Sequence, residues 1–385
     1  MKEFNFNFKI VEFTKEELYY FAENEEDKRK IDKIIIDYPV RITEYLRELM
    51  KNSEAIKKQY LPSPNELKTI GTPTPFEEGK ESAKTYGLER IYRDRVLIAP
   101  NFECPAYCRY CYKKSRVLRG KHGMTNQEID SAVLELSKME HVRGVVITGG
   151  EPFLNPTKLF YLLDKLIELD NIYEIRVGTR TLLNQPQIFT NELAEKLASY
   201  IRPNFENPEK SKYLAMNVHF NHPDELASDV LKAVHKLTSR GITLRNQTVL
   251  LKGINDDAET TKKLFSLLLR NNIIVYYLNH CMPVEGADHL RTSVQKGKDI
   301  YTELCTESSS IIPNYVYAPS GGKAHVGVES NLIYKEIDGI RYIETILPYK
   351  AEEFFEITKH DKLPYLHEIT EDGLIKSYYI DGDDN

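Results

Sequence analysis

The sequence predicts an α/β protein built around a parallel sheet. From about residue 95, short β-branched runs alternate with stretches of helical periodicity. Polar residues and glycines gather directly after these runs, which is where parallel α/β folds place their active sites. The alternation is compatible with a full or partial (βα) barrel or with a doubly wound sheet.

Residues 1–85 are predicted to form a charged, helical N-terminal extension. Its clearest amphipathic segments are Lys15–Glu23 and Thr43–Lys58. Between residues 61 and 79 the chain carries Pro62, Pro64, Pro73 and Pro75, and this spacing indicates an extended connector.

Residues 86–330 contain the predicted strands and helices of the sheet domain. One helix begins at Thr125, which forms a capping-box pattern with Glu128. The predicted strands are Val96–Ala99, Val145–Thr148, Glu174–Gly178, Ala215–Phe220, Thr243–Leu251, Ile273–Leu278 and Ile311–Tyr317. In residues 331–385, Asp338-Gly339 and Asp372-Gly373 lie between β-prone runs and predict a small, hairpin-rich tail.

Composition narrows the classes of function. The formal net charge of -6 gives no basic surface for nucleic acid. No apolar run is long enough to cross a membrane, and we expect a cytoplasmic protein. Five cysteines in so long a chain argue against a disulfide framework.

Three of these cysteines, Cys104, Cys108 and Cys111, form a C-x3-C-x2-C loop after a predicted strand. Thiolates are soft ligands that suit an iron–sulfur cluster or zinc. Three thiolates leave one iron of a [4Fe–4S] cluster without a protein ligand, and an open coordination site is typical of catalysis. The alternatives are buried small residues or a zinc site with His122 as a poorly spaced fourth ligand.

A second motif, Thr148-Gly149-Gly150-Glu151-Pro152, follows the next strand. Its glycines allow a ligand to approach the backbone closely, and Glu151 or nearby carbonyls can accept hydrogen bonds from an ammonium group. Alone it could equally be a strand-to-helix turn. After a three-cysteine loop, it resembles the segment of radical S-adenosylmethionine (SAM) enzymes that binds the SAM amino group.

Further segments resemble, in order, the lysine 2,3-aminomutase family over residues from about 60 to 327. They are 92–97, 177–181, 219–223, 246–251, 253–256, 289–292 and 318–323. The resemblance implies a partial (βα)6 TIM-like barrel of the radical SAM type. It also implies that Arg180, His219 and Gln247 line the SAM and cofactor cavity, although each could be a satisfied polar residue of the barrel interior.

Members of this family also use pyridoxal 5′-phosphate (PLP). The resemblance assigns the cofactor lysine to Lys323, a phosphate-binding arginine to Arg95 and a neighbour of the cofactor to Tyr92. A solvated lysine after a turn is the alternative for Lys323. The second arginine that is frequent in the family is Ile91 here, and Arg90 or Arg93 could compensate.

Three positions depart from the lysine-specific pattern. Met282 and Tyr317 replace the two aspartates that recognise the substrate's distal ammonium, and Lys113, with Arg116 nearby, replaces the arginine that binds its carboxylate. A desolvated ammonium needs compensating negative charge, so lysine is not the expected substrate. Cys305 is the last cysteine, so the C-terminal zinc site of some members is missing and other contacts would have to hold a homo-oligomer.

The leading hypothesis is therefore a PLP-dependent radical SAM 2,3-aminomutase that acts on a free amino acid other than lysine, through a 5′-deoxyadenosyl radical. An electron donor such as flavodoxin or ferredoxin would reduce the cluster. One alternative is a radical SAM enzyme of the same fold that catalyses a different reaction: modification of a protein lysine, or dehydrogenation, deamination or fragmentation of an amino acid. The other is a non-catalytic zinc-binding interaction protein.

Overall fold

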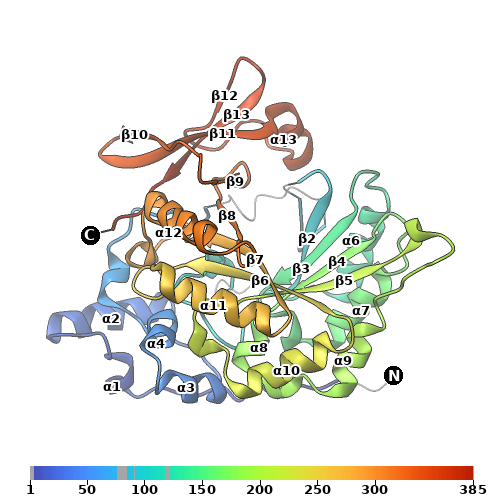
Figure 1. Cartoon of the computed structure of the whole chain (residues 1–385), viewed down its shortest axis with the longest axis horizontal. Coiled ribbons are helices and arrows are strands. Elements are labelled where there is room, and N and C mark those ends of the chain that lie inside the picture. The colour runs from blue at the N-terminus through green and yellow to red at the C-terminus, as the bar shows by residue number, and fades with distance from the viewer. Residues whose placement is uncertain (1–3, 76–84, 91, 118–121, 385) are drawn as a thin grey trace.

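The computed structural model describes residues 4–75, 85–90, 92–117 and 122–384 (Figure 1). At its centre lies a sheet of nine strands whose spatial order is their order in the chain. Strands β2 to β8 are parallel to one another, while β1 pairs antiparallel with β2 and β9 pairs antiparallel with β8. The strands are β1 (Leu88–Glu89), β2 (Arg95–Asn101), β3 (Gly144–Gly149), β4 (Glu174–Gly178), β5 (Tyr213–Val218), β6 (Thr243–Leu250), β7 (Ile273–His280), β8 (Asn314–Tyr317) and β9 (Ala324–His325).

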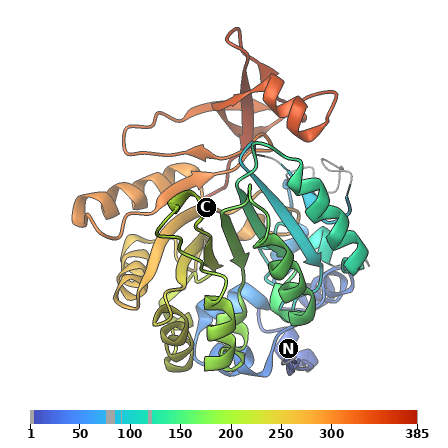
Figure 2. The same ribbon diagram turned by 90° about the vertical axis from the view of Figure 1, so that its right-hand side faces the viewer.

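Each of the six strands β2 to β7 is followed by at least one helix, and the helices lie on the outside of the curved sheet (Figure 2). They are α5 (Lys114–Val117) and α6 (Asn126–Ser137), α7 (Pro156–Leu166), α8 (Thr181–Asn184) and α9 (Asn191–Ala198), α10 (Ser228–Thr238), α11 (Ala258–Arg270) and α12 (Val294–Glu307). Six strand–helix units that end in β8 confirm the predicted (βα)6 partial barrel.

Local sequence explains why these elements form where they do. Thr125 accepts from the backbone of Glu128, whose side chain accepts from the Thr125 backbone, so α6 begins at the predicted capping box. Ile129, Ala132 and Leu136 bury one face of this helix completely. All seven predicted strands are present, and their ends differ from the predicted ends by at most three residues.

The described part of the N-terminal extension contains four α-helices: α1 (Lys15–Leu18), α2 (Glu25–Asp37), α3 (Glu44–Met50) and α4 (Glu54–Tyr60). The predicted segment Thr43–Lys58 is divided between two helices, because the Ser53 hydroxyl accepts from the Ile56 backbone and caps a new helix that begins at Glu54. Sequence analysis did not single out α2, which is the longest of the four. Ile42, Leu46, Ile56 and Tyr60 have no exposed surface and belong to the main core.

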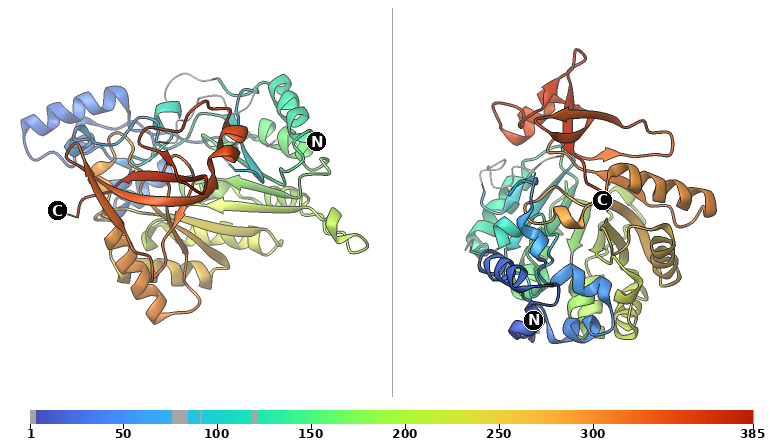
Figure 3. Two further views of the ribbon diagram at one scale, coloured as in Figure 1. Left: turned by 90° about the horizontal axis from the view of Figure 1, so that it is seen from above. Right: turned by 90° about the vertical axis from the view of Figure 1, so that its left-hand side faces the viewer.

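The C-terminal residues form a separate antiparallel sheet in the order β10 (Ile333–Ile337), β11 (Ile340–Lys350), β13 (Leu374–Ile380), β12 (Glu368–Ile369), with helix α13 (Ala351–Thr358). Both predicted turns are present: Asp338 and Gly339, with φ of 51° and 76°, join β10 to β11, and Gly373 precedes β13. Seen from above, this sheet lies across the barrel (Figure 3). None of the helices in the described ranges is long and apolar enough to span a bilayer.

Candidate active site

The cysteine loop runs from the carboxyl end of β2 to α5, and the N-terminal extension holds it there. The Tyr38 hydroxyl donates to the Cys108 carbonyl at 2.9 Å, and the Arg109 backbone donates to the Gln59 carbonyl at 2.8 Å. The Arg109 guanidinium is fully buried and binds Glu66, with Nε to Oε1 at 2.9 Å. A buried ion pair of this geometry fixes the loop tightly.

The three thiols lie close to one another and are half-buried. Burial raises the pKa of Cys111 to about 12, and the neighbouring Cys108 contributes to the rise. Burial, Cys111 and Glu151 together raise the pKa of Cys104. Crowded, partly desolvated thiols of this kind gain from binding a cationic iron centre, which favours their thiolate forms.

The geometry of the three sulfurs favours a cluster over a single ion. In the described residues, the one set of three or more ligating atoms that all lie within 4.8 Å of one another is Glu259, Glu303 and Glu307, which are exposed. At least one pair of the three sulfurs is therefore more than 4.8 Å apart. Cysteines of an iron–sulfur cluster each bind a different iron, so a wider spacing fits the cluster.

The Gly-Gly-Glu-Pro segment packs directly against the cysteine loop. A Cβ at Gly150 would lie 2.1 Å from the Glu103 carbonyl oxygen, and one at Gly149 would lie 2.5 Å from that of Asn101. The Glu151 carboxylate is 4% exposed and accepts from the Thr179 hydroxyl at 2.7 Å and from the Arg180 backbone at 2.9 Å. The glycines thus serve close packing, and the carboxylate joins β3 to the turn after β4.

Arg180 contacts the cysteine loop directly. Its Nη1 donates to Cys108 Sγ at 2.9 Å, and its Nη2 donates to Glu225 Oε1 at 2.9 Å and to Gln59 Oε1 at 2.7 Å. Gln59 and Glu225 have no exposed surface. The guanidinium is therefore fixed beside the sulfur by two buried partners, one of which comes from helix α4.

The other two predicted SAM-site residues lie just after β5 and on the neighbouring strand β6. The His219 ring follows β5, and its Nε2 lies 2.9 Å from the Tyr110 hydroxyl, which also accepts from Asn221 at 2.7 Å. Burial and the nearby Arg180 hold the pKa of His219 well below its usual value, so the ring is neutral. Gln247 is half-buried on β6, opposite Tyr277 of β7.

Lys323 lies on the turn between β8 and β9, and its amine is surrounded by aromatic and cationic groups. Nζ is 3.6 Å from the centre of the Tyr277 ring. Burial lowers the Lys323 pKa to about 7, and the positive charges of Arg95 and Arg176 contribute. A lysine with so low a pKa is a nucleophilic amine near neutral pH, as Schiff-base chemistry requires.

Arg95 and Tyr92 lie beside this lysine. The Arg95 guanidinium stacks on the Tyr92 ring at 4.3 Å, and its buried Nε makes no hydrogen bond but lies 3.8 Å from Asp94 Oδ1. A guanidinium whose buried donor is not hydrogen-bonded is suited to an anionic ligand such as a phosphate. Ile91, which stands where the family often has a second arginine, lies outside the described residues.

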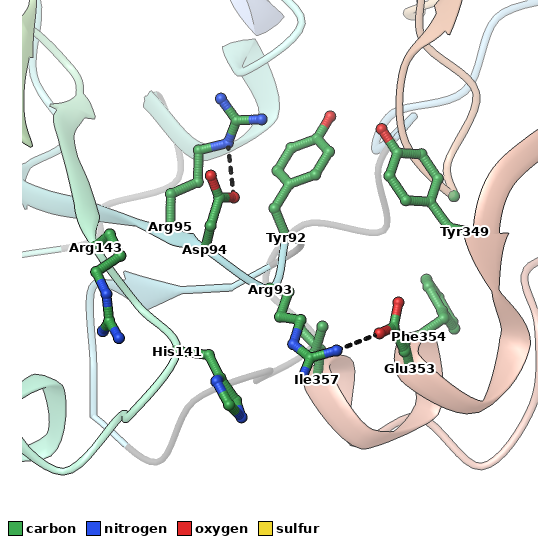
Figure 4. A pocket seen from close by; sticks show the side chains of 11 residues that line it. Tyr92, Arg93, Asp94, Arg95, His141, Arg143, Tyr349, Glu353, Phe354 and Ile357 are labelled. Carbon is green, nitrogen blue, oxygen red and sulfur yellow. Dashed lines mark hydrogen bonds and ion pairs between the residues drawn. The ribbon is translucent and has the colours of Figure 1, made fainter.

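A cavity of about 440 Å³ opens at the amino ends of β2 and β3 (Figure 4). Tyr92 and Arg95 line one side, and Tyr349, Glu353 and Phe354 of the C-terminal addition line the other. In Figure 4 the Tyr92 and Tyr349 side chains point the same way, and Arg93 pairs with Glu353 at 2.7 Å across the gap.

The three predicted substrate residues lie in different surroundings. Lys113 is buried near the thiols and counteracts the rise in the Cys104 pKa. Met282 is half-buried in the loop after β7. Tyr317 instead packs on Tyr379 of β13, with ring centroids 5.0 Å apart.

Arg116, the alternative carboxylate ligand, forms an ion pair with Glu89 of β1. Sequence reasoning missed Gln59, Tyr110, Glu225 and Tyr349. The first three are joined to Arg180 and His219 by hydrogen bonds between segments far apart in the chain, and Tyr349 lies in the tail, where no motif marked it.

Comparisons with known proteins agree with this geometry. Residues 98–265 match the model of the radical SAM superfamily. A putative L-lysine 2,3-aminomutase of Aquifex aeolicus is 36% identical over 332 residues, which are 83% of this chain and 86% of the relative. The L-lysine 2,3-aminomutase of Methanococcus maripaludis is 32% identical over 80% of this chain and 71% of its own. The glutamate 2,3-aminomutase of Clostridioides difficile is 32% identical over 67% of this chain and 62% of its own.

Proposed function

Because the chain belongs to the radical SAM superfamily and, within it, to the lysine 2,3-aminomutase family, we propose that it is a PLP-dependent aminomutase. It would move the α-amino group of a free amino acid other than lysine to the β carbon. Membership alone makes the chain a radical SAM isomerase, so the non-catalytic zinc-binding alternative is wrong.

The carboxyl end of the barrel supports the SAM half of the proposal. Cys104, Cys108 and Cys111 would hold a [4Fe–4S] cluster whose remaining iron binds SAM. When bound, the cluster and SAM supply a 5′-deoxyadenosyl radical. Arg180 would orient Cys108 through its hydrogen bond to the sulfur. Gly149, Gly150 and Glu151 would form the surface against which SAM binds. The neutral His219 and Gln247 would border the same space.

Lys323 carries the PLP half of the proposal. When bound, PLP supplies a carbonyl that holds the amino group and delocalises an unpaired electron. Lys323, with its lowered pKa, would hold the cofactor, Arg95 would bind the phosphate with its guanidinium, whose Nε makes no hydrogen bond within the chain, and Tyr92 would pack beside it. These residues therefore fit the cofactor that the family resemblance implies.

The surroundings of the barrel interior argue against lysine as the substrate. Buried carboxylates could balance a distal ammonium, but those found among the described residues are each already bound to other groups of the chain: Glu66, Glu151, Glu225 and Asp381. Met282 has no charge, and Tyr317 packs on Tyr379. A relative named for lysine and a relative named for glutamate are equally similar to this chain, at 32% sequence identity each. Sequence identity therefore does not indicate which amino acid is the substrate. Lys113 would bind the carboxylate of an amino acid with an uncharged side chain.

The three segments would divide this work. Residues 1–85 would brace the cysteine loop, residues 86–330 would hold the cofactors, and residues 331–385 would cover the side of the barrel on which Lys323 lies. A one-electron donor such as flavodoxin or ferredoxin would supply the electron that SAM cleavage requires.

The test is anaerobic incubation of the reconstituted protein with SAM, PLP, a reductant and each of the twenty amino acids in turn. We expect a β-amino acid of unchanged mass from at least one substrate other than lysine, and no product from Lys323→Ala. Products of altered mass would favour dehydrogenation, deamination or fragmentation instead. A protein that cleaves SAM but whose product formation is unaffected by Lys323→Ala contradicts the PLP assignment.

A further inference from the structure

The turn that carries Lys323 is covered by the C-terminal sheet at very short range. A Cβ at Gly321 would lie 2.7 Å from Leu347 Cδ1, and one at Gly322 would lie 2.5 Å from Tyr349 Cε2. Leu347 and Tyr349 both belong to β11. The two glycines therefore allow β11 to lie directly on the turn, because a larger residue at either position would force the Leu347 or Tyr349 side chain to shift.

Two tyrosine hydroxyls meet at the backbone of Lys323. Burial raises the pKa of Tyr349, and a hydrogen bond from the Lys323 backbone acts against that rise. Tyr92 receives a hydrogen bond from the same backbone, although burial and the neighbouring Tyr349 raise its pKa overall. The two rings lie 5.9 Å apart, edge to face, one from the barrel and the other from the C-terminal sheet.

Helix α13 extends this contact along the cavity. Glu353, Phe354 and Ile357 form the wall opposite Arg95, and Glu353 pairs with Arg93 at 2.7 Å. The cavity beside Lys323 is therefore bounded by the barrel on one side and by the C-terminal addition on the other (Figure 4).

We propose that Tyr349 is a positioning residue for Lys323, and that β11 and α13 complete the cofactor site by holding the lysine turn against the barrel. Tyr349 acts through the Lys323 backbone and through Gly322, so it fixes the direction of the lysine side chain without contacting the reacting atoms. It also keeps water from the amine. The ligand class is a phosphorylated aldehyde, so this inference rests on the proposed function.

The test compares Tyr349→Ala and Tyr349→Phe with the wild type. Tyr365→Ala is the matched control, because Tyr365 belongs to the same C-terminal addition and is 77% exposed. The first measurement is reductive methylation of Lys323 by formaldehyde and cyanoborohydride from pH 5 to pH 11, quantified by peptide mass. This measurement reports the lysine's own protonation and needs no PLP. The second measurement is PLP affinity by absorbance titration.

For Tyr349→Ala we expect the pH midpoint of Lys323 methylation to rise by about one unit or more, towards that of an ordinary lysine. Tyr349→Phe keeps the ring and loses one hydrogen bond, so we expect PLP affinity to fall about fivefold to tenfold. Tyr365→Ala should match the wild type in both measurements.

Failure of the proposed function and failure of the Tyr349 inference would give different results. A wild type that binds no PLP contradicts the proposed function, while the methylation profiles still decide the role of Tyr349. A Tyr349→Ala protein with the wild-type methylation midpoint overturns the inference, whatever the PLP result. If Tyr349→Ala does not fold, Tyr349→Phe decides: an unchanged methylation profile and unchanged PLP affinity overturn the inference.

Discussion

The buried Arg180 side chain connects three segments that lie far apart in the chain. It joins a sulfur of the cysteine loop, a carboxylate after β5 and an amide from α4, at distances between 2.7 and 2.9 Å. Hydrogen bonds to the sulfurs of an iron–sulfur cluster set its reduction potential, because they stabilise the more negative, reduced state. We therefore assign Arg180 a role in tuning electron transfer as well as in holding the loop.

Replacing Arg180 by lysine should lower the cluster's reduction potential. The variant keeps the positive charge but loses the bond to Cys108, which as a charge-assisted hydrogen bond is worth about 1.5 kcal/mol, or on the order of 60 mV for one electron. A redox titration followed by electron paramagnetic resonance measures the shift. The exposed Arg202→Lys is the control, and equal potentials in all three proteins would contradict this role.

Lys323 should make the stability of the PLP-free protein depend on pH. Its pKa is about 7 in the folded protein and about 10.5 in the unfolded chain. Between these values the unfolded chain holds a proton that the folded protein lacks, so the free energy of unfolding rises with pH. Below pH 7 both states are protonated, and the folded protein bears the full cost of a buried charge.

Lys323→Met should therefore be more stable than the wild type at pH 6, by on the order of 2 kcal/mol, and the difference should shrink by pH 9. Urea unfolding at both pH values, without PLP, measures it. A difference that is the same at pH 6 and pH 9 would show that the lysine is not desolvated.

At the scale of elements, the sequence predicts the barrel well and its contacts poorly. Strands such as Glu174–Gly178 are predicted because β-branched residues and turn signals are local properties. Local pattern does not single out α2, because most of its 13 residues are charged and only Ile31 and Ile34 are buried. The cysteine loop and Lys323 were found by motif, but the bond from Arg180 to Cys108 joins residues 72 positions apart and leaves no local signal.

The close contact between the glycine motif and the cysteine loop can be tested by adding one methyl group. In Gly150→Ala the new Cβ would lie 2.1 Å from the Glu103 carbonyl oxygen, so the two loops must separate. We expect the reconstituted variant to bind less than half of the wild-type iron and sulfide, and to lose roughly 2 kcal/mol of stability. Gly327→Ala is the control, since its nearest neighbour would be 3.8 Å away. Full iron content in Gly150→Ala would mean that the contact does not support the cluster.

For the molecule as a whole, the three sequence segments share one core. Leu46 and Tyr60 of the extension, Ile147 of the barrel, and Leu347 and Ile375 of the tail all belong to the same buried cluster. The boundaries at about residues 85 and 330 therefore do not divide the protein into independent cores. Hydrophobic contacts cross both of them. Local patterns could not predict this, because burial depends on which surfaces meet in space.

A protein reduced to residues 86–330 should consequently fail to fold into a rigid structure. It would expose the apolar faces that Leu46, Tyr60 and Leu347 cover in the full chain, and removing several fully buried side chains costs more than the 5–15 kcal/mol by which domains are typically stable. Near-ultraviolet circular dichroism and cooperative thermal melting report on rigid packing. A sharp melting transition in the shortened protein would contradict the shared core.

The direction of β2 has a consequence for assembly of the holoenzyme. Its first residue, Arg95, lies near Lys323 and the C-terminal addition, while the cysteine loop follows its last residue, Asn101, and contacts the N-terminal extension. One strand length thus separates the residues proposed to hold PLP from those proposed to hold the cluster and SAM. The two small molecules would not compete for the same side chains, so we expect the protein to bind PLP with the same affinity whether or not SAM is present.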